Sequence, residues 1–254
     1  MQTLEVLFTP ADFEALRGRD LSDSVCVVFD VLRATTTMLT ALANGARSVI
    51  PVADIPAAVA WRRRRPEVLL AGERNGLRIR SEQAGGVDFD LGNSPREFTP
   101  GRVAGRVIVA TTTNGTRALK ACAGAAAILP AGLVNVSTVA RWLARERPAG
   151  VVVVGSGTYE DAAYEDVLGA GALVDRLWPA LEGTRVLDSA RLARTVYRAA
   201  GGRLLEAVAA ESRNGRRLLA LPELAEDVSL CLAEDTLPVR AWMEGDEVVA
   251  AGGV

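Results

Sequence analysis

One junction of the chain combines residue types that can bind an anion and a metal ion: Asp30-Val31-Leu32-Arg33-Ala34-Thr35-Thr36-Thr37. Apolar residues 25–29 precede it and predict a buried strand, and residues 34–44 follow it and predict a helix that Gly45 ends. Backbone N–H groups at a helix start attract anions, arginine binds anions, and a carboxylate can hold a divalent cation. The junction therefore predicts a binding site for an anion, a metal ion or both.

The alternative for Asp30 is a structural role, in which its carboxylate caps the helix. Thr35 and Thr36 could cap that helix without it, and Asp30 stands at the strand end where α/β sheets bind ligands, so we interpret it as functional. A packed helix leaves Arg33 little room on its surface. We therefore expect Arg33 to point into the crevice.

A second junction repeats the first. Residues 107–110 predict another buried strand, and a helix-like run begins near Asn114, with polar residues between and around them: Thr111, Thr112, Thr113, Asn114, Gly115, Thr116 and Arg117. This turn could bind an anion through hydroxyl and backbone N–H groups, or it could simply cap the helix. The order of elements is the same in 27–51 and 107–130, which fits either an internal duplication or two ordinary βαβ units.

The residues that the chain lacks narrow its chemistry. It has no histidine, which excludes Ser-His-Asp triads, phosphohistidine chemistry and His-based zinc sites. Its one lysine, Lys120, falls inside the second helix-like run, which argues against Schiff-base chemistry and a Walker-type loop. The remaining carboxylate, arginine, hydroxyl and backbone N–H groups suit a magnesium-assisted reaction on an anionic substrate.

The composition is that of a globular protein, with 254 residues, 49% hydrophobic residues and a net charge of −2. The near-neutral charge argues against nucleic acid as a partner. Three cysteines, Cys26, Cys122 and Cys231, lie far apart in apolar runs, and we expect them to be buried free thiols. We recognise no leader or membrane-spanning stretch, so we expect a cytoplasmic protein with no membrane partner.

Strand-like and helix-like segments alternate along most of the chain, which predicts an α/β fold: a mostly parallel sheet with helices on both faces. Helices are expected from Asn114 and Asn135, where each Asn stands at a position from which it could cap its helix. The C-terminal third is rich in helical patterns and ends in a predicted hairpin around Gly245. We interpret residues 1–254 as a single domain of two lobes that divide near residue 131.

Residues 72–105 form a long segment with little periodicity and many Gly, Pro, Asp and Arg residues, which favours a functional loop. It contains Glu73, Arg74 and Asp90. These charged residues beside glycines of fixed geometry are candidates for the same site as Asp30.

Two later motifs leave alternatives open. Gly155-Ser156-Gly157 begins a dinucleotide-binding pattern, but Glu160 replaces its third glycine, so we expect only a tight turn beside the site. Glu165 and Asp166 then open a helix. They either complement the helix dipole or bind the same metal as Asp30, and the sequence favours neither.

Five stretches together resemble the 2-phosphosulfolactate phosphatase family: DVLRATTT (30–37), AGERNG (71–76), FDLGNSP (89–95), TTTNGT (111–116) and EDVLGAG (165–171). The resemblance continues through residues 212–216 and 226–228 and covers nearly the whole chain in order and spacing. It implies a magnesium-dependent phosphatase that removes phosphate from 2-phospho-3-sulfolactate, a step toward coenzyme M. It also implies a three-layer α/β/α fold built of two related halves.

The resemblance and the residue chemistry together suggest individual roles. Metal ligands are expected among Asp30, Glu73, Asp90 and Asp166. The expected catalytic residues are Asp30, Arg33, Glu73 and Arg74. Substrate binding is expected from the two Thr-rich turns and the arginine after the second: Thr35, Thr36, Thr112, Thr113, Asn114, Gly115, Thr116 and Arg117.

In the expected mechanism, Mg²⁺ held by Asp30, Glu73 and Asp166 bridges the phosphate, and a metal-activated water, or Asp30 itself, attacks phosphorus. Enzymes accelerate phosphate-monoester hydrolysis by up to ~10²¹-fold, whereas a helix terminus stabilises an anion by only about 0.3–2 kcal/mol, so metal and arginines must supply most of the catalysis. One alternative is a haloacid-dehalogenase-like aspartyl-phosphate route, although Leu32 stands where those enzymes have a second Asp. The other alternative is a phosphometabolite-binding protein without activity. A homodimer is the default expectation.

Overall fold

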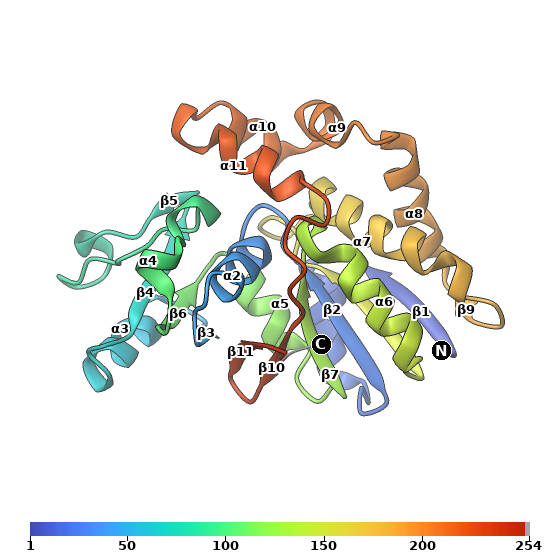
Figure 1. The fold of residues 1–254 in the computed structure, drawn as a ribbon, viewed down its shortest axis with the longest axis horizontal. Helices are drawn as coiled ribbons and strands as arrows, with labels where there is room; N and C mark the ends of the chain where they lie inside the picture. Colours follow the sequence, from blue (N-terminus) through green and yellow to red (C-terminus); the bar gives the residue numbers. More distant parts are fainter. Residues whose placement is uncertain (252–254) are drawn as a thin grey trace.

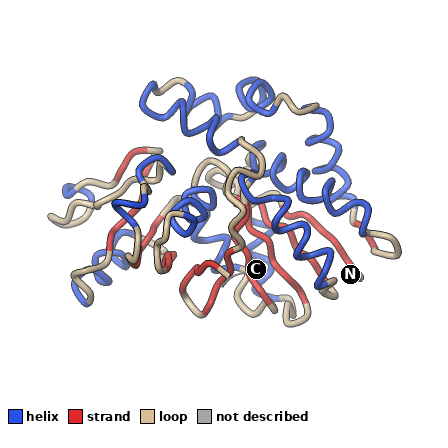
Figure 2. The backbone as a smooth tube through the Cα atoms, in the orientation of Figure 1, coloured by secondary structure: helices blue, strands red, loops and turns tan. Residues whose placement is uncertain are grey.

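The computed structural model describes residues 1–251 and confirms an α/β fold (Figure 1, Figure 2). The strands form two sheets, whereas the sequence suggested one. The first sheet contains five parallel strands in the order β7-β2-β8-β1-β9, with the bounds Ala127–Ala131, Ser24–Phe29, Gly150–Gly155, Thr3–Leu7 and Arg185–Val186. The second is mixed, in the order β10-β11-β3-β6-β4-β5, with the bounds Ala241–Glu244, Glu247–Ala250, Ser48–Pro51, Val107–Thr111, Leu69–Arg74 and Leu77–Arg78. Its three strands β3, β6 and β4 are parallel.

Helices cover both faces of each sheet (Figure 1). The outer face of the first sheet packs against α6, α7 and α8 (Val136–Glu146, Tyr164–Leu177 and Asp188–Ala200). The space between the sheets is filled by α2 and α5 (Ala34–Ala43 and Gly115–Ala121), and the outer face of the second sheet is covered by α3 (Ile55–Arg64). Each sheet is thus the middle of a three-layer α/β/α arrangement, and the two arrangements share one helix layer.

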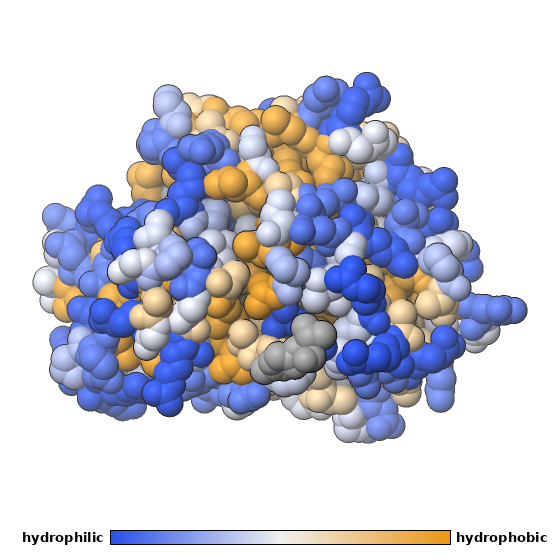
Figure 3. Space-filling model, viewed as in Figure 1, coloured by the Kyte–Doolittle hydropathy of each residue, from blue (hydrophilic) through white to orange (hydrophobic). Residues whose placement is uncertain are grey.

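The remaining helices are shorter or lie toward the C-terminus. Two short ones are α1 and α4 (Pro10–Glu14 and Pro100–Val103). A C-terminal group lies at the top of Figure 1 and consists of α9, α10 and α11 (Leu204–Glu211, Arg213–Leu219 and Pro222–Leu232). Figure 3 shows the face of the molecule that is turned to the reader in Figure 1. Polar residues cover much of it, and apolar residues gather over the helices at the top of the view. Within residues 1–251, no helix is both long and apolar enough to cross a bilayer.

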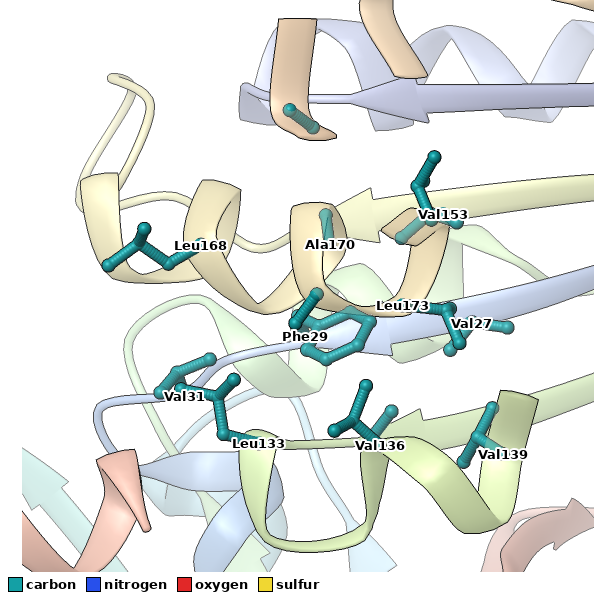
Figure 4. Close-up of a cluster of buried hydrophobic side chains, with 14 of the residues drawn as sticks. Val27, Phe29, Val31, Leu133, Val136, Val139, Val153, Leu168, Ala170 and Leu173 are labelled. Atoms are coloured by element: carbon teal, nitrogen blue, oxygen red, sulfur yellow. The ribbon is translucent and has the colours of Figure 1, made fainter. Parts of the chain in front are cut away.

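The central strand β2 is buried on both faces because helices cover both. Val27 and Phe29 face the core under α6 and α7, where Figure 4 shows them with Leu173 and Val136. Val28, which points the other way, belongs to the core between the sheets. A continuous apolar run is the pattern expected of such a strand. Burial on both faces fixes the register and makes Asp30 the first residue beyond the strand.

The two Thr-rich junctions connect the sheets in opposite directions. In the first, β2 of the first sheet leads through Asp30 and α2 to β3 of the second sheet. In the other, β6 of the second sheet leads through residues 112–114 and α5 to β7 of the first sheet. The similar order of elements in 27–51 and 107–130 therefore corresponds to two strand–helix–strand units that exchange sheets.

Several local predictions are confirmed. Pro10 begins α1, Gly45 follows α2 with a φ of +87°, the C-terminal hairpin forms, and the three cysteines are buried and free. The predicted Asn caps are wrong. Asn114 and Asn135 occupy N-cap positions, but neither side chain accepts a hydrogen bond from its own helix. The single domain with a division near residue 131, and the homodimer, stay predictions.

Candidate active site

The turns that follow β2, β4 and β6 open into one cleft, which α10 also lines. Six of the predicted site residues line it: Asp30, Arg33, Glu73, Thr112, Thr113 and Asn114. The structure thus brings together both junctions and the start of the irregular segment. Each of these turns stands at the carboxyl end of its strand, where open α/β sheets bind ligands, and together they bring the ligand-binding ends of both sheets to one place.

Asp30 is a half-buried carboxylate in the wall of this cleft. Its Oδ1 accepts a hydrogen bond from the backbone N–H of Ala34 at 3.1 Å. The pKa of Asp30 is raised to about 7, chiefly by burial and then by the carboxylates of Glu73 and Glu165, against the lowering effects of the Ala34 N–H and of Arg33. A cation in the cleft would relieve this repulsion between carboxylates.

Gly115 has no side chain, and the Asp30 carboxylate lies where that side chain would be. A Cβ at position 115 would lie 2.6 Å from Asp30 Oδ2 and 2.7 Å from the Cβ of Ala34. The first turn of α5 therefore lies directly against the first junction, and any side chain at 115 would displace the Asp30 carboxylate.

Glu73 joins the irregular segment to the second junction. Its Oε1 accepts hydrogen bonds from the N–H and the hydroxyl of Thr113, at 3.1 and 2.8 Å. Its Oε2 accepts one from the N–H of Gly76 at 2.6 Å, which closes the β4–β5 turn on itself. These bonds hold the Glu73 carboxylate at a fixed position, with only 7% of the residue exposed.

Arg33 is held in a buried ion pair. Its Nη1 lies 2.7 Å from Asp227 Oδ2, and its Nη2 donates to the carbonyl of Gly76 at 2.7 Å. Asp227 also accepts hydrogen bonds from Ser94 and Arg96, at 2.6 and 2.8 Å. The expectation that Arg33 reaches the crevice is confirmed, but its charge there is matched by a carboxylate.

Glu165 and Asp166, at the start of α7, accept hydrogen bonds from neighbouring loops and helices. Glu165 accepts from Ser212 and Asn214, at 2.7 and 3.1 Å. Asp166 accepts hydrogen bonds from the N–H groups of Val31 and Gly157, at 2.8 and 3.0 Å, and only 2% of it is exposed. Burial, and then the charges of Asp30 and Glu165, raise the pKa of Asp166 well above its usual range, although the two N–H groups oppose this. Asp166 therefore holds together the residue after Asp30 and the loop that follows β8.

The threonines of the first junction do not cap α2, which corrects our interpretation of the sequence. Thr35 Oγ1 donates to the carbonyl of Ala131 at 2.7 Å, and Thr36 Oγ1 donates to that of Val31 at 3.1 Å. Asp30 provides the capping oxygen. Only one oxygen of this carboxylate is used for capping, since Oδ1 accepts from Ala34 and Oδ2 faces Gly115.

Arg74 and Arg117, which the sequence suggested as anion-binding residues, do not line the cleft. Arg74 donates to the hydroxyl of Thr111 at 3.1 Å. Arg117 forms an ion pair with Glu160 at 3.1 Å. Both guanidinium groups thus connect neighbouring parts of the fold.

Asp90 and Thr116 also lie outside the lining of the cleft. Asp90 accepts a hydrogen bond from the N–H of Leu70 at 2.7 Å and pairs with Arg62. Thr116 is buried, and its hydroxyl has no hydrogen-bond partner among residues 1–251. The placement of Asp90 separates it from the carboxylates of Asp30 and Glu73.

The oxygen donors in the cleft fit Mg²⁺. Asp30 and Glu73 contribute carboxylates, and the lining residue Asn114 has an amide oxygen, Oδ1, that is buried without a hydrogen-bond partner in the described part of the chain. Within residues 1–251, no three His, Cys, Asp or Glu side chains are grouped as a metal site. Magnesium is usually held by one or two carboxylates together with waters and substrate phosphates, so the oxygens present are those it takes.

Sequence reasoning missed several residues of the site. Asp227, Asn214 and Arg217 come from the C-terminal helices, and Asn93 and Tyr159 come from loops. Residues 212–216 and 226–228 already belonged to the stretches that carried the family resemblance. That was the available signal, but it gave no role to any side chain.

Comparison with known proteins places the chain in a family. Residues 12–244 match the family model described as 2-phosphosulpholactate phosphatase. A protein of Caldanaerobacter subterraneus subsp. tengcongensis is 36% identical over 237 residues, which cover 92% of this chain and 93% of that protein. A protein of Gloeobacter violaceus is 42% identical over 213 residues, which cover 83% and 84% of the two chains. Both relatives are named "Probable 2-phosphosulfolactate phosphatase". The chain therefore belongs to the 2-phosphosulfolactate phosphatase family, and it is a phosphoric monoester hydrolase.

Proposed function

We propose that this protein is a Mg²⁺-dependent phosphatase that hydrolyses 2-phosphosulfolactate, or a closely related small phosphorylated acid, to the free hydroxy acid and phosphate. The observation that supports this most is that Asp30, Glu73 and Asn114 line one cleft, and that Asn114 Oδ1 is buried without a hydrogen-bond partner within residues 1–251. Carboxylates repel a phosphate group unless a cation lies between them. A phosphatase cleft of this composition therefore calls for a metal ion.

In this proposal, Asp30 and Glu73 hold Mg²⁺, and Asn114 Oδ1 is a neutral third donor. The bound ion supplies Lewis-acid stabilisation of the phosphoryl oxygens. Thr113 orients the Glu73 carboxylate through its two hydrogen bonds, and Thr112 lies beside it in the cleft wall. These residues are fixed by the fold before substrate arrives, as electrostatic catalysis requires.

Arg33 contributes a rigid edge of the phosphate site. Asp227 and the Gly76 carbonyl each hold one of its terminal nitrogens, so the guanidinium plane cannot rotate away. Arginine presents N–H donors in a fixed fork that matches phosphate oxygens. We propose that its remaining N–H hydrogens face the substrate phosphate.

We propose further that water attacks phosphorus and that Asp30 is not phosphorylated. One Asp30 oxygen caps α2, and Leu32 is a buried apolar residue where the aspartyl-phosphate route needs an acid. Turnover quenched in acid, followed by mass spectrometry of the Asp30 peptide, tests this. The expected peptide carries no phosphoryl group, and a phosphorylated Asp30 would establish the covalent route instead.

A substrate screen tests the proposed function itself. Phosphate release is measured across small phosphorylated acids, with Mg²⁺ and with a chelator in its place. We expect 2-phosphosulfolactate to be among the best substrates and release to require Mg²⁺. Tight binding of 2-phosphosulfolactate without release at any Mg²⁺ concentration would favour a binding protein without activity.

A further inference from the structure

The charged groups that line the cleft leave one positive charge without a partner. The lining contains the carboxylates of Asp30 and Glu73 and the guanidinium groups of Arg33 and Arg217. Arg33 is matched by Asp227. Arg217, by contrast, forms no ion pair with any carboxylate within residues 1–251, and its Nη2 donates to Asn214 Oδ1 at 3.0 Å.

The other arginines of α10 are occupied outside the cleft. Arg213 pairs with Asp161 at 3.0 Å and donates to the carbonyl of Thr158. Arg216 donates to the carbonyl of Ala210 and does not line the cleft, whereas Arg217 is an exposed residue that does. Arg217 is therefore the one arginine of α10 that both lines the cleft and has no acidic partner in the described chain.

A chain of hydrogen bonds aims Arg217 at the cleft. Asn214 Nδ2 donates to Glu165 Oε1 and to the carbonyl of Leu32, both at 3.1 Å, which leaves Asn214 Oδ1 to accept from Arg217. The same nitrogen lies close to the β4–β5 turn, because a Cβ at Gly76 would lie 3.6 Å from Arg217 Nη2. Asn214 is buried, so it supports the arginine from within the protein.

We propose that Arg217 binds a second acid group of the substrate, a carboxylate or sulfonate on a carbon next to the one that bears the phosphate. This inference rests on the proposed function, which places the phosphate at Asp30, Glu73 and Arg33. A guanidinium binds such an acid through parallel N–H bonds, and a site built to pair a charged group rejects an analogue that lacks it. Arg217 thus selects phosphorylated acids over simple phosphate esters.

The kinetic test compares three substrates: 2-phosphosulfolactate, 2-phospholactate and ethyl phosphate. In Arg217→Gln, we expect kcat/KM for 2-phosphosulfolactate to fall about 10–100-fold, the loss of one or two charge-assisted hydrogen bonds, while ethyl phosphate changes less than about threefold. A similar fall for 2-phospholactate identifies the carboxylate as the bound group, and no fall identifies the sulfonate. An equal fall for all three substrates, or no fall for any, would overturn the proposal.

Two further variants separate binding from folding. Arg216→Gln removes the same charge from the same helix outside the cleft, and we expect wild-type kinetics. Arg217→Lys keeps the charge and should recover part of the preference for acids over ethyl phosphate. If Arg217→Gln is poorly folded by circular dichroism, the absence of this recovery in a folded Arg217→Lys contradicts the proposal.

A binding measurement keeps this inference distinct from the proposed function. If the wild-type protein releases phosphate from none of the three substrates, the proposed function has failed. Calorimetric titration with 3-sulfolactate still tests Arg217. We expect weaker binding to Arg217→Gln than to Arg216→Gln, and equal binding to both variants would overturn the assignment.

Discussion

Arg33 and Asp227 form an ion pair with an Nη1–Oδ2 distance of 2.7 Å, and both side chains are almost completely buried. The pair connects the first junction to α11, 194 residues further along the chain. Because Asp227 also accepts hydrogen bonds from Ser94 and Arg96, one carboxylate fastens α11 to the irregular segment as well. The ion pair thus attaches α11, which packs against the cleft-lining α10, to Arg33 in the cleft wall.

Breaking this pair should destabilise the protein strongly. We expect Asp227→Asn to lower the free energy of unfolding by about 3–5 kcal/mol, because Arg33 would remain buried without a counter-charge. Glu226→Gln is a matched control, since Glu226 is the neighbouring residue, is exposed and also pairs with Arg96. That variant should cost less than about 1 kcal/mol. Urea unfolding measures both values, and equal costs would contradict the structural role of Asp227.

Removing the Glu73 carboxylate should weaken magnesium binding. We expect Glu73→Gln to lower Mg²⁺ affinity by at least about tenfold, the lower end of what is seen for groups that merely orient metal ligands. Asp90→Asn should leave the affinity unchanged, because Asp90 is bonded to Leu70 and Arg62 outside the cleft. Calorimetric titration with MgCl₂ compares the variants. A larger loss in Asp90→Asn than in Glu73→Gln would show that the metal lies elsewhere.

Asp30 should make the metal-free protein less stable as the pH rises. Its pKa is about 7 in the folded protein against 3.8 for an unperturbed Asp, so the folded state binds more protons between these values. Stability is therefore lost as pH rises from about 4 to 7, by at most about 1.4 kcal/mol per pH unit. In Asp30→Asn, the amide oxygen can still accept the hydrogen bond from the Ala34 N–H, but the side chain carries no charge at any pH.

The measurement is thermal unfolding in chelator at several pH values. We expect Asp30→Asn to melt above the wild-type protein at pH 8, with the difference shrinking toward pH 5. A difference that stays constant over this range would show that the Asp30 charge is not the cause.

Adding one methyl group at Gly115 should disturb the reaction. The new Cβ of Gly115→Ala would lie 2.6 Å from Asp30 Oδ2, so the carboxylate must move. Because a displacement of about 1 Å can cost about 10²-fold in rate, we expect kcat/KM to fall at least about tenfold. Gly101→Ala in α4, where no atom lies within 4 Å of the new Cβ, is the control and should leave kcat/KM unchanged. The kinetics of phosphate release give kcat/KM for both variants. Equal values in Gly115→Ala and Gly101→Ala would contradict the prediction.

The sequence predicted the parts of the site that depend on local pattern. Asp30, Glu73 and Thr113 each stand at or just beyond the carboxyl end of a strand, where α/β sheets bind ligands, and the structure places them in one cleft although the strands belong to two sheets. Buried strands and the C-terminal hairpin followed from apolar runs and turn residues. The division of the strands into two sheets did not follow, because it depends on which distant strands pair.

Side-chain directions and distant partners were beyond the sequence pattern. Arg74 and Arg117 look like anion clamps by residue type, yet the fold turns them toward Thr111 and Glu160. Asp227 is the partner of Arg33 only because α11 folds back over the first junction, which helical periodicity cannot show. The Thr35 hydroxyl has a carbonyl acceptor at Ala131 that exists only once β7 pairs with β2.

Phosphate release from 2-phosphosulfolactate, measured while Mg²⁺ is titrated into chelator-treated protein, tests the central claim most directly. We predict no release without the metal, saturable release as Mg²⁺ is added, and a rate at least about 10²-fold lower in Asp30→Asn at every Mg²⁺ concentration. Release that is independent of Mg²⁺, or near-normal turnover in Asp30→Asn, would contradict the assignment of Asp30 and Glu73 as the metal-binding centre of this phosphatase.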